Sequence, residues 1–380
     1  MDELRITRIR HLFYPDMQPD YFFELSKRQA EAGHEVDILT WRKNGSYSDK
    51  VVAGGFIIHR LHGLNFRMDG MIEEYPYLPR LPAEIEMLKS EIVHGESHLF
   101  LTTFQAISKA KSLGLPSVVT VHGVLAYRGF AVNSMQRIYL HTLGSEVFKR
   151  ADRVICLTRG DAGEIVKLGC NPEKIRLVPN AIDTERFRPG KKQDDNLITW
   201  VGRFVPEKGV QYLIEAARIV ANEFRDVRFI LVGYGPLETK IMKLAFDHGL
   251  LNKFVFFTGA LDRDEVAKVL GKSRIFVFPS LKEGLPVSVL EAMASGLSVI
   301  GSDIEGINDV ISDQYNGLLV PSKNPKALAS AISTLLNDRS LGKKMGKNAR
   351  QSMTEKYSWD IVSNKIEKVY YEAIEAAKRP

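Results

Sequence analysis

The sequence is poor in cysteine, with only Cys156 and Cys170 among 380 residues. Two thiols cannot form a disulfide scaffold, and no metal-type Cys/His spacing surrounds them, so we expect buried thiols in a reducing compartment. No run of about 18 apolar residues, the length that a transmembrane helix needs, occurs in the sequence. The first ten residues, MDELRITRIR, alternate charged and apolar residues, which is not typical of a signal peptide. We therefore expect a cytoplasmic protein.

A concentration of charge of one sign is also missing. The net charge is +6, from 52 Lys+Arg and 46 Asp+Glu, and residues 1–185 hold 23 of each sign. A nucleic-acid-binding protein would show a basic stripe with interleaved aromatic residues and a recognisable module, and the sequence has neither. We expect no nucleic-acid partner, but a mildly basic enzyme with an anionic ligand in its second half.

Short apolar segments alternate along the chain with amphipathic segments of helical length. Strands are expected at residues 6–13, 35–40, 117–121, 153–157, 197–201, 228–232, 254–257, 275–278 and 298–300, and helices at 21–32, 209–222 and 285–295. This alternation predicts an α/β fold with parallel sheets covered on both faces. Because 380 residues exceed one ordinary core, we expect two domains.

The segment Val178–Asp195 is rich in Pro, Gly, Asn and charge, and it interrupts this alternation. We therefore predict a linker there, with an N-terminal domain at residues 1–185 and a C-terminal domain at residues 186–358. Residues 359–380 carry one apolar helical stripe. Since ligands bind at the carboxyl ends of parallel strands, the loops after the strands should carry the chemistry.

Two such loops contain unusual charges. Glu283–Glu291 reads EGLPVSVLE, a carboxylate followed by a Gly/Pro loop and a helix that carries a second carboxylate. The helix N-terminus suits an anion, and sugar hydroxyls could satisfy Glu291 among its apolar neighbours. Taken alone, the two acids are equally well explained as an exposed loop acid and a helix-surface acid.

Gly202–Gly209 reads GRFVPEKG and places Arg203 and Lys208 beside a helix start. Two cations in that position suit a diphosphate, although a lone pair of this kind is more often solvated surface charge. A third loop, GYGP at residues 233–236, resembles the start of a dinucleotide fingerprint. It has Glu238 in place of the last glycine, so this signal is weak.

These loops, in this order, resemble the retaining glycosyltransferases of family 4. The resemblance is carried by ADRVICLTRGDAGEIVKLGCNPEKIRLVPNAIDTERFRP, VGRFVPEKGVQYLIEAA, LVGYGP, FTGALDRDEV and FVFPSLKEGLPVSVLEAMASGLSVIGSD. It implies the GT-B fold, with two Rossmann-like domains facing across a cleft and a C-terminal helix at 359–380 that crosses back to the first domain. It also implies transfer of a hexosyl unit from a UDP- or GDP-linked sugar to a sugar, glycolipid or other hydroxyl acceptor. We expect neither a cofactor nor a metal.

The resemblance assigns roles to particular residues. Glu283 would bind the hydroxyls of the transferred sugar and Glu291 the nucleotide ribose, while Arg203 and Lys208 would hold the diphosphate. His122, in VVTVHG, matches a family histidine beside the sugar, although an isolated histidine is more often structural. The other implied donor-binding residues are Gly202, Gly233, Leu261, Gly284, Leu285, Val287 and Ser288. Pro286 replaces a frequent glycine and cannot donate a backbone hydrogen bond.

Two N-terminal segments are not explained by the resemblance: one departs from the family pattern, and the other has a sequence of its own. Tyr14–Asp20 reads YPDMQPD where the family often has a Gly-Gly loop, so either the Met17 and Gln18 amides approach the phosphate or this domain contributes less to donor binding. Leu64–Pro82 carries aromatics and methionine that suit a lipid-linked acceptor, a peripheral contact with the inner face of a membrane, or a lid.

Alternative interpretations stay open at this point. Asp262–Arg263–Asp264 matches a metal-binding Asp-x-Asp pattern, but an N-cap before a helix fits its context better. His94 and His98 have the i, i+4 spacing of a zinc pair, although lining of the cleft fits better. The alternative functions are a nucleotide-sugar 2-epimerase of the same fold and a non-catalytic protein that binds nucleotide-sugars as part of a complex.

Overall fold

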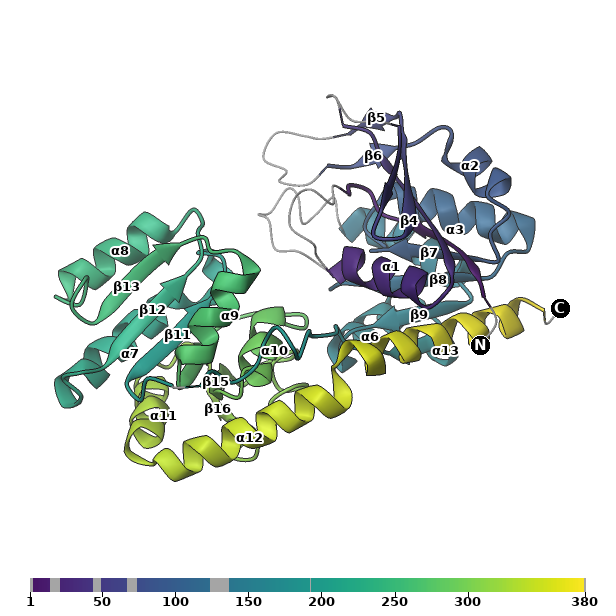
Figure 1. Ribbon diagram of the computed structural model, residues 1–380. Coiled ribbons are helices and arrows are strands. Elements are labelled where there is room, and N and C mark those ends of the chain that lie inside the picture. The colour runs from purple at the N-terminus through teal and green to yellow at the C-terminus, as the bar shows by residue number, and fades with distance from the viewer. Residues whose placement is uncertain are drawn as a thin grey trace. The chain divides into compact units, whose positions relative to one another are not determined.

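The computed structural model describes residues 3–13, 21–43, 49–66, 74–123, 137–191 and 193–378. The loop at residues 14–20, with Met17 and Gln18, lies outside them. The chain divides into two compact units (Figure 1). The N-terminal unit contains Met1–Pro179 together with Ser363–Pro380, and the C-terminal unit contains Asn180–Val362. The described residues contain no helix that combines the length and the apolar character needed to cross a membrane.

The N-terminal unit is built on an eight-stranded sheet with the order β10-β9-β8-β7-β1-β2-β4-β3. Its strands are β1 (Arg5–Ile9), β2 (Glu35–Trp41), β3 (Lys50–Ala53), β4 (Phe56–Leu61), β7 (Ile92–Glu96), β8 (Ser117–Val121), β9 (Arg153–Cys156) and β10 (Ile175–Leu177). All neighbours are parallel except β3 and β4. The central strands β7 and β8 are buried along their whole length, as a parallel sheet requires.

Helices connect these strands. They are α1 (Tyr21–Glu31), α2 (Leu81–Met87), α3 (Leu101–Leu113), η1 (Leu140–Gly144), α5 (Ser145–Arg150), α6 (Arg159–Lys167) and η2 (Pro172–Lys174), and a small hairpin pairs β5 (Leu64–Asn65) with β6 (Pro76–Tyr77). Ile107, Val119 and Phe148 belong to one apolar cluster, which packs α3 and α5 against the sheet. Cys156 and Cys170 are free and buried, as predicted.

The C-terminal unit contains a six-stranded parallel sheet with the order β13-β12-β11-β14-β15-β16. The strands are β11 (Leu197–Val201), β12 (Arg228–Val232), β13 (Val255–Gly259), β14 (Ile275–Phe278), β15 (Ser298–Ser302) and β16 (Leu318–Val320). The helical elements are η3 (Pro206–Lys208), α7 (Val210–Glu223), α8 (Glu238–Asp247), α9 (Arg263–Lys272), α10 (Val287–Ala294), α11 (Pro325–Asn337) and α12 (Arg339–Lys356). Large buried rings, among them Trp200, Phe229 and Phe276, fill its core.

The division between the units falls between Pro179 and Asn180, rather than after residue 185. The physical reason lies in the first residues of the predicted linker. The Asn180 side chain donates a hydrogen bond to the Leu285 carbonyl at 3.5 Å, and the Ile182 amide donates to the Tyr357 carbonyl at 2.8 Å. This part of the linker segment is therefore already bound to the C-terminal unit.

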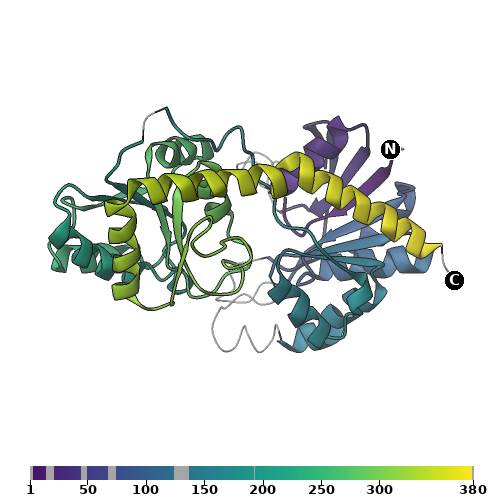
Figure 2. The ribbon, with the colours of Figure 1, turned by 90° about the horizontal axis from the view of Figure 1, so that it is seen from below.

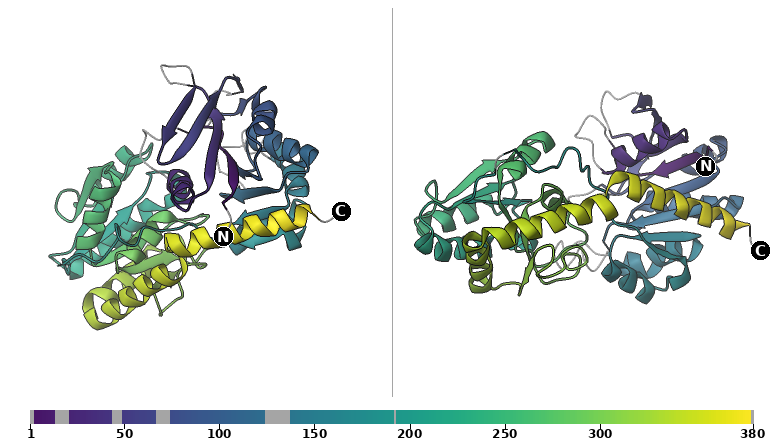
Figure 3. Two further views of the ribbon diagram at one scale, coloured as in Figure 1. Left: turned by 45° about the vertical axis from the view of Figure 1, so that its right-hand side comes forward. Right: turned by 60° about the horizontal axis from the view of Figure 1, so that its bottom comes forward.

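The last helix, α13 (Trp359–Ala377), begins in the C-terminal unit, and from Ser363 onward it belongs to the N-terminal unit. Figures 2 and 3 show it in yellow. Its apolar stripe is buried at Val362, Ile366, Val369 and Tyr370, as the helical spacing predicts. The crossing back of the C-terminal helix and the α/β class with two parallel sheets are therefore confirmed.

Candidate functional site

Three loops of the C-terminal unit follow the carboxyl ends of neighbouring strands. Strand β11 is hydrogen-bonded to β12 on one side and to β14 on the other. The loops after these strands therefore start side by side, at the edge where parallel sheets bind ligands. They are Gly202–Gly209 after β11, the GYGP loop at 233–236 after β12, and the segment from Pro279 to Pro286 after β14.

An ion pair joins the first of these loops to the third. Lys208 Nζ lies 2.6 Å from Glu283 Oε1, with 20% and 8% of the two side chains exposed. The Lys208 ammonium also lies 5.0 Å above the Phe278 ring, at the end of β14. In addition, the Leu281 amide donates a hydrogen bond to the Glu207 carbonyl at 2.7 Å. The structure thus brings together two residues that are 75 positions apart in the sequence.

Glycines allow the three loops to pack backbone against backbone. Gly209 has φ +60°, and a Cβ there would lie 2.2 Å from the Pro279 carbonyl oxygen. Gly233 has φ +138°, and a Cβ there would lie 1.8 Å from the Gly202 oxygen. Neither position can hold a side chain without moving the neighbouring loop. This explains Gly209 of GRFVPEKG and Gly233 of GYGP without a dinucleotide fingerprint.

Glu291 is buried on α10, where the sequence predicted a carboxylate in need of a partner. Arg263 Nη2 of α9 lies 3.2 Å from its Oε1. Burial raises the pKa of the Glu291 carboxyl to about 7, although the Arg263 charge acts in the opposite direction. Arg263 was not singled out from the sequence, because the acids on either side of it drew attention to a metal pattern.

Those two acids have other roles in the structure. Asp262 is the N-cap of α9 and forms a full capping box with Glu265, as the N-cap interpretation predicted. Asp264 pairs with Arg186 at 3.1 Å. Within the described ranges, no group of three or more His, Cys, Asp or Glu side chains is placed to hold a metal ion.

Among the other predicted donor-binding residues, Leu285, Val287 and Ser288 lie at the start of α10. Pro286 is the N-cap and supplies no side-chain hydrogen bond, so the cap leaves first-turn amides at Val287 and Ser288 uncapped. Leu285 is buried, whereas Gly284 and Leu261 are partly exposed. Arg203 is exposed, and its side chain has no ion pair with any residue that the structure describes. The structure therefore joins Lys208 to Glu283 but does not join Arg203 to them.

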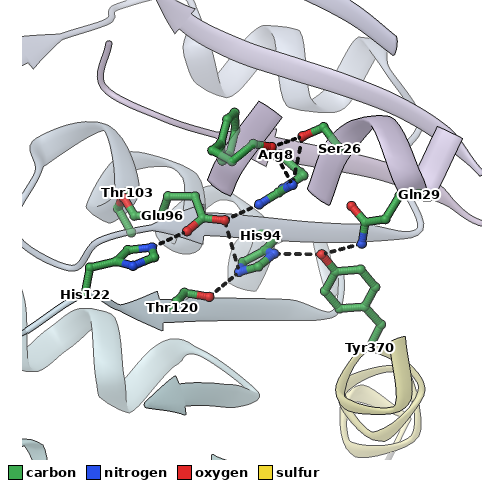
Figure 4. A network of polar contacts seen from close by, with 10 residues as sticks. Arg8, Ser26, Gln29, His94, Glu96, Thr103, Thr120, His122 and Tyr370 are labelled. Carbon is green, nitrogen blue, oxygen red and sulfur yellow. Dashed lines mark hydrogen bonds and ion pairs between the residues drawn. The ribbon is translucent and has the colours of Figure 1, made fainter. Parts of the chain in front are cut away.

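In the N-terminal unit, His122 follows β8 and contacts a buried carboxylate. His122 Nε2 lies 2.7 Å from Glu96 Oε2, and Arg8 of β1 pairs with the other carboxylate oxygen (Figure 4). The Arg8 and Glu96 side chains are almost wholly buried, whereas 35% of the His122 side chain is exposed. Burial by itself would raise the pKa of Glu96, but the surrounding imidazoles and the Arg8 guanidinium more than reverse this and hold it well below its ordinary value.

His94 and His98 do not line a cleft, so this expectation is wrong. His94 lies within strand β7 rather than on a helix, and the side chains of both residues are completely buried. His94 Nδ1 lies 2.7 Å from Tyr370 Oη of α13, and its Nε2 lies 2.8 Å from Thr120 Oγ1. Burial lowers the pKa of His94 to about 3, so the ring is neutral at neutral pH. His98 lies beyond the end of β7, so the two rings do not share one helical face as the i, i+4 spacing would require.

Sequence reasoning did not identify Glu96, Arg8 or Tyr370. Glu96 carried a signal, because it is a charged residue at the carboxyl end of a buried strand, in IVHGE. Arg8 lies inside a strand, and Tyr370 lies on the apolar stripe of the last helix, where an aromatic residue is usually core. Their association depends on contacts across 88 and 276 positions of the sequence.

Solved structures show the same fold. Sucrose-phosphate synthase from Thermosynechococcus elongatus superposes with a TM-score of 0.76 at 21% identity and covers 98% of this chain and 100% of its own. HepE from Anabaena, solved with UDP and glucose, gives 0.76 at 14% identity, with 97% and 100% covered. The fold is therefore that of the GT-B glycosyltransferases, as predicted.

Sequence relatives then give the family. The model "Glycosyltransferase Family 4" matches residues 20–186, and "Glycosyl transferases group 1" matches residues 181–352. A UDP-Gal:alpha-D-GlcNAc-diphosphoundecaprenol alpha-1,3-galactosyltransferase from Escherichia coli is 30% identical over 322 residues, 80% of this chain and 81% of the relative. The gpi3 subunit of phosphatidylinositol N-acetylglucosaminyltransferase from Schizosaccharomyces pombe is 24% identical over 372 residues, 95% of this chain and 79% of the relative. This chain belongs to the family 4 glycosyltransferases, group 1.

Proposed function

We propose that this protein is a retaining glycosyltransferase that moves a hexosyl unit from a UDP- or GDP-linked sugar to a sugar, glycolipid or other hydroxyl acceptor. The observation that carries the proposal is the 2.6 Å contact between Lys208 and Glu283. It puts a cation and a carboxylate in one place, at the carboxyl ends of β11 and β14. Membership of the family supports the transferase class.

The charges of this cluster suit the chemistry of the donor. Breaking the bond between the anomeric carbon and the diphosphate leaves negative charge on the phosphate. Lys208, Arg203 and the first-turn amides at Val287 and Ser288 would stabilise that charge as it develops, which is usually the largest catalytic contribution. Glu283 would accept hydrogen bonds from sugar hydroxyls, and Glu291 would bind the ribose. Retention follows in this proposal from attack on the face that the diphosphate leaves, with the leaving phosphate taking the acceptor proton.

We propose that the reaction needs no metal, because the two cations supply the positive charge. Addition of EDTA should then leave the transfer rate unchanged. Complete loss of activity that Mn²⁺ or Mg²⁺ restores would contradict this and would turn attention to Asp262 and Asp264.

We propose a lipid-linked carbohydrate as the acceptor, bound by the N-terminal unit at the inner face of a membrane. The E. coli relative is named for a diphosphoundecaprenol-linked substrate. In this chain, Leu64, Phe66 and Tyr77 are exposed to 62%, 55% and 40%. These apolar side chains flank residues 67–73, which lie outside the described ranges. Sedimentation with vesicles, compared between the wild type and a Leu64→Ser, Phe66→Ser variant, tests the membrane contact.

The Glu283→Gln variant tests the function most directly. It keeps the size of the side chain but removes its charge, while the proposed ribose and diphosphate contacts remain. We expect the affinity for the nucleoside diphosphate to stay within a few-fold and the transfer rate to fall about 10²-fold, about 2.7 kcal/mol. Glu355→Gln, an exposed change on α12, is the matched control.

Other outcomes identify the alternatives. Equal losses of nucleotide binding and turnover would mean that Glu283 organises the loop rather than the sugar. Conversion of the donor to its 2-epimer without an acceptor would identify an epimerase. Nucleotide binding by a wild type that turns over no nucleotide-sugar would identify a non-catalytic subunit.

A further inference from the structure

Three neighbouring strands bring the polar groups around Glu96 to one face of the N-terminal sheet. Arg8 on β1 stands opposite His94 on β7, and Glu96 on β7 stands opposite Thr120 on β8. Because side chains two positions apart on a strand share a face, His94 and Glu96 point to the same side. The strand ends are thereby arranged so that His122, just beyond β8, meets Glu96 (Figure 4).

Contacts other than that with His122 hold the Glu96 carboxylate and its backbone in place. Arg8 pairs with one of its oxygens, and Ser26 Oγ accepts a hydrogen bond from Arg8 Nη1 at 2.8 Å. Thr103 Oγ1 donates a hydrogen bond to the Glu96 carbonyl at 3.2 Å. At Gly95, a Cβ would lie 2.6 Å from Thr103 Cγ2, so the glycine lets α3 press against the end of this strand.

We propose that Glu96 is a positioning residue for His122, which fixes the proton on Nε2 and leaves Nδ1 as the hydrogen-bond acceptor for a hydroxyl of the donor sugar. A carboxylate held by Arg8 can only accept, so the 2.7 Å contact requires His122 to donate from Nε2. A neutral imidazole then has Nδ1 unprotonated. The inference rests on the proposed function for the identity of the sugar, but the tautomer itself does not.

The ligand-free wild type gives the first test. With 15N-labelled histidine at about pH 8, long-range proton–nitrogen correlation spectra report whether the ring is neutral and which ring nitrogen carries the proton. We expect His122 to carry it on Nε2. A proton on Nδ1, or rapid exchange between the two forms, would overturn the proposal.

The Glu96→Gln variant should move the ring proton of His122 to the other nitrogen. Since Arg8 can only donate, the amide oxygen of the glutamine should turn to Arg8 and its NH₂ group to His122. His122 Nε2 must then accept, and the proton moves to Nδ1. We expect inversion of the tautomer, a 10- to 100-fold lower kcat/KM for the donor sugar, and nucleoside diphosphate affinity within about twofold of the wild type.

Two controls separate positioning from a general loss of structure. Ser26→Ala removes a hydrogen bond from the same buried network without touching Glu96 or His122, so the tautomer should stay unchanged. In a His122→Ala background, Glu96→Gln should change kcat/KM by less than about twofold, because its effect passes through the imidazole. Inversion by Ser26→Ala, or a full loss in the His122→Ala background, would overturn the proposal.

Failure of the proposed function gives a different pattern. If the wild type transfers no sugar but His122 carries the proton on Nε2, the assignment of the tautomer stands and the contact with the donor sugar is refuted.

Discussion

The two polar clusters of this protein are built differently. In the C-terminal unit, Lys208 and Glu283 form one ion pair between two loops, and part of the lysine is exposed. In the N-terminal unit, the side chains of Arg8, Glu96 and His94 are buried against one face of the sheet. His122, which contacts Glu96, has a side chain that is about one-third exposed. The first cluster is partly open to solvent, whereas most of the contacts in the second are made within the protein and His122 is its exposed member.

This difference predicts how substitutions should divide between activity and stability. One-fifth of the Lys208 side chain is exposed, so water can replace part of what Glu283 loses, and we expect loss of this pair to affect turnover more than folding. A buried charge that loses its partner is left without compensation, which destabilises the fold strongly. The following changes are ordered from the largest expected effect to the smallest.

Lys208→Ala should give the largest effect, on turnover rather than on folding. It removes a charge proposed to stabilise the leaving diphosphate, so we expect kcat/KM to fall about 10²- to 10³-fold. Steady-state kinetics with the working donor measure this, and chemical denaturation measures stability. Lys282→Ala, at an exposed lysine on the loop that carries Glu283, is the matched control.

Arg203→Ala sharpens the same test, because Arg203 has no ion pair with a described residue that could be lost. We expect a fall in kcat/KM of similar size without any change in the free energy of unfolding. Wild-type kinetics in both variants would remove the diphosphate role from this cluster.

Glu291→Gln should show an effect of pH on stability. The pKa of the folded Glu291 carboxyl is about 7, against 4.5 for the free group, so the folded state binds the proton more tightly. Its stabilising contribution is present below about pH 4.5 and is lost as the pH rises through 7. The glutamine variant, which has no charge to bury, should gain stability relative to the wild type over this interval, on the order of 3 kcal/mol.

Urea denaturation of both proteins at pH 5 and pH 8 measures this difference. A difference between the two proteins that does not change with pH would show that Arg263 fully compensates for the burial of Glu291.

The comparison also shows what could be predicted from the sequence. The strands at 117–121, 197–201, 228–232 and 275–278 have the predicted bounds, because short β-branched and aromatic runs between breakers define buried strands well. The Lys208–Glu283 cluster was predictable in kind, since both residues follow strands in loops with glycine and proline. Its roles in binding and catalysis remain predictions.

The N-terminal network was much less predictable. A buried Arg8 in a strand carries no local signal of its partner, and Tyr370 has the spacing of an ordinary core residue. Which strand lies beside which decides these contacts, and strand order is a property of the whole sheet. The expectation that His94 and His98 line a cleft was wrong because both side chains are buried, His94 within β7 and His98 just beyond it.

Tyr370→Phe should have the smallest effect. It tests whether Tyr370, which bonds to His94 rather than to Glu96 or His122, contributes to stability alone and not to activity. Because His94 is neutral, a consistent set of hydrogen bonds has the Tyr370 hydroxyl donating to His94 Nδ1 and accepting from Gln29 Nε2 at 3.2 Å. Loss of the hydroxyl leaves two buried groups without a partner, so we expect about 1–2 kcal/mol of destabilisation in chemical denaturation. Transfer activity should stay within about twofold, because the contact between Glu96 and His122 is untouched. Tyr315→Phe, at an exposed site of the C-terminal unit, is the control and should change neither quantity. A tenfold loss of activity in Tyr370→Phe alone would contradict this expectation and would show that the docking of α13 reaches His122 through His94 and Glu96.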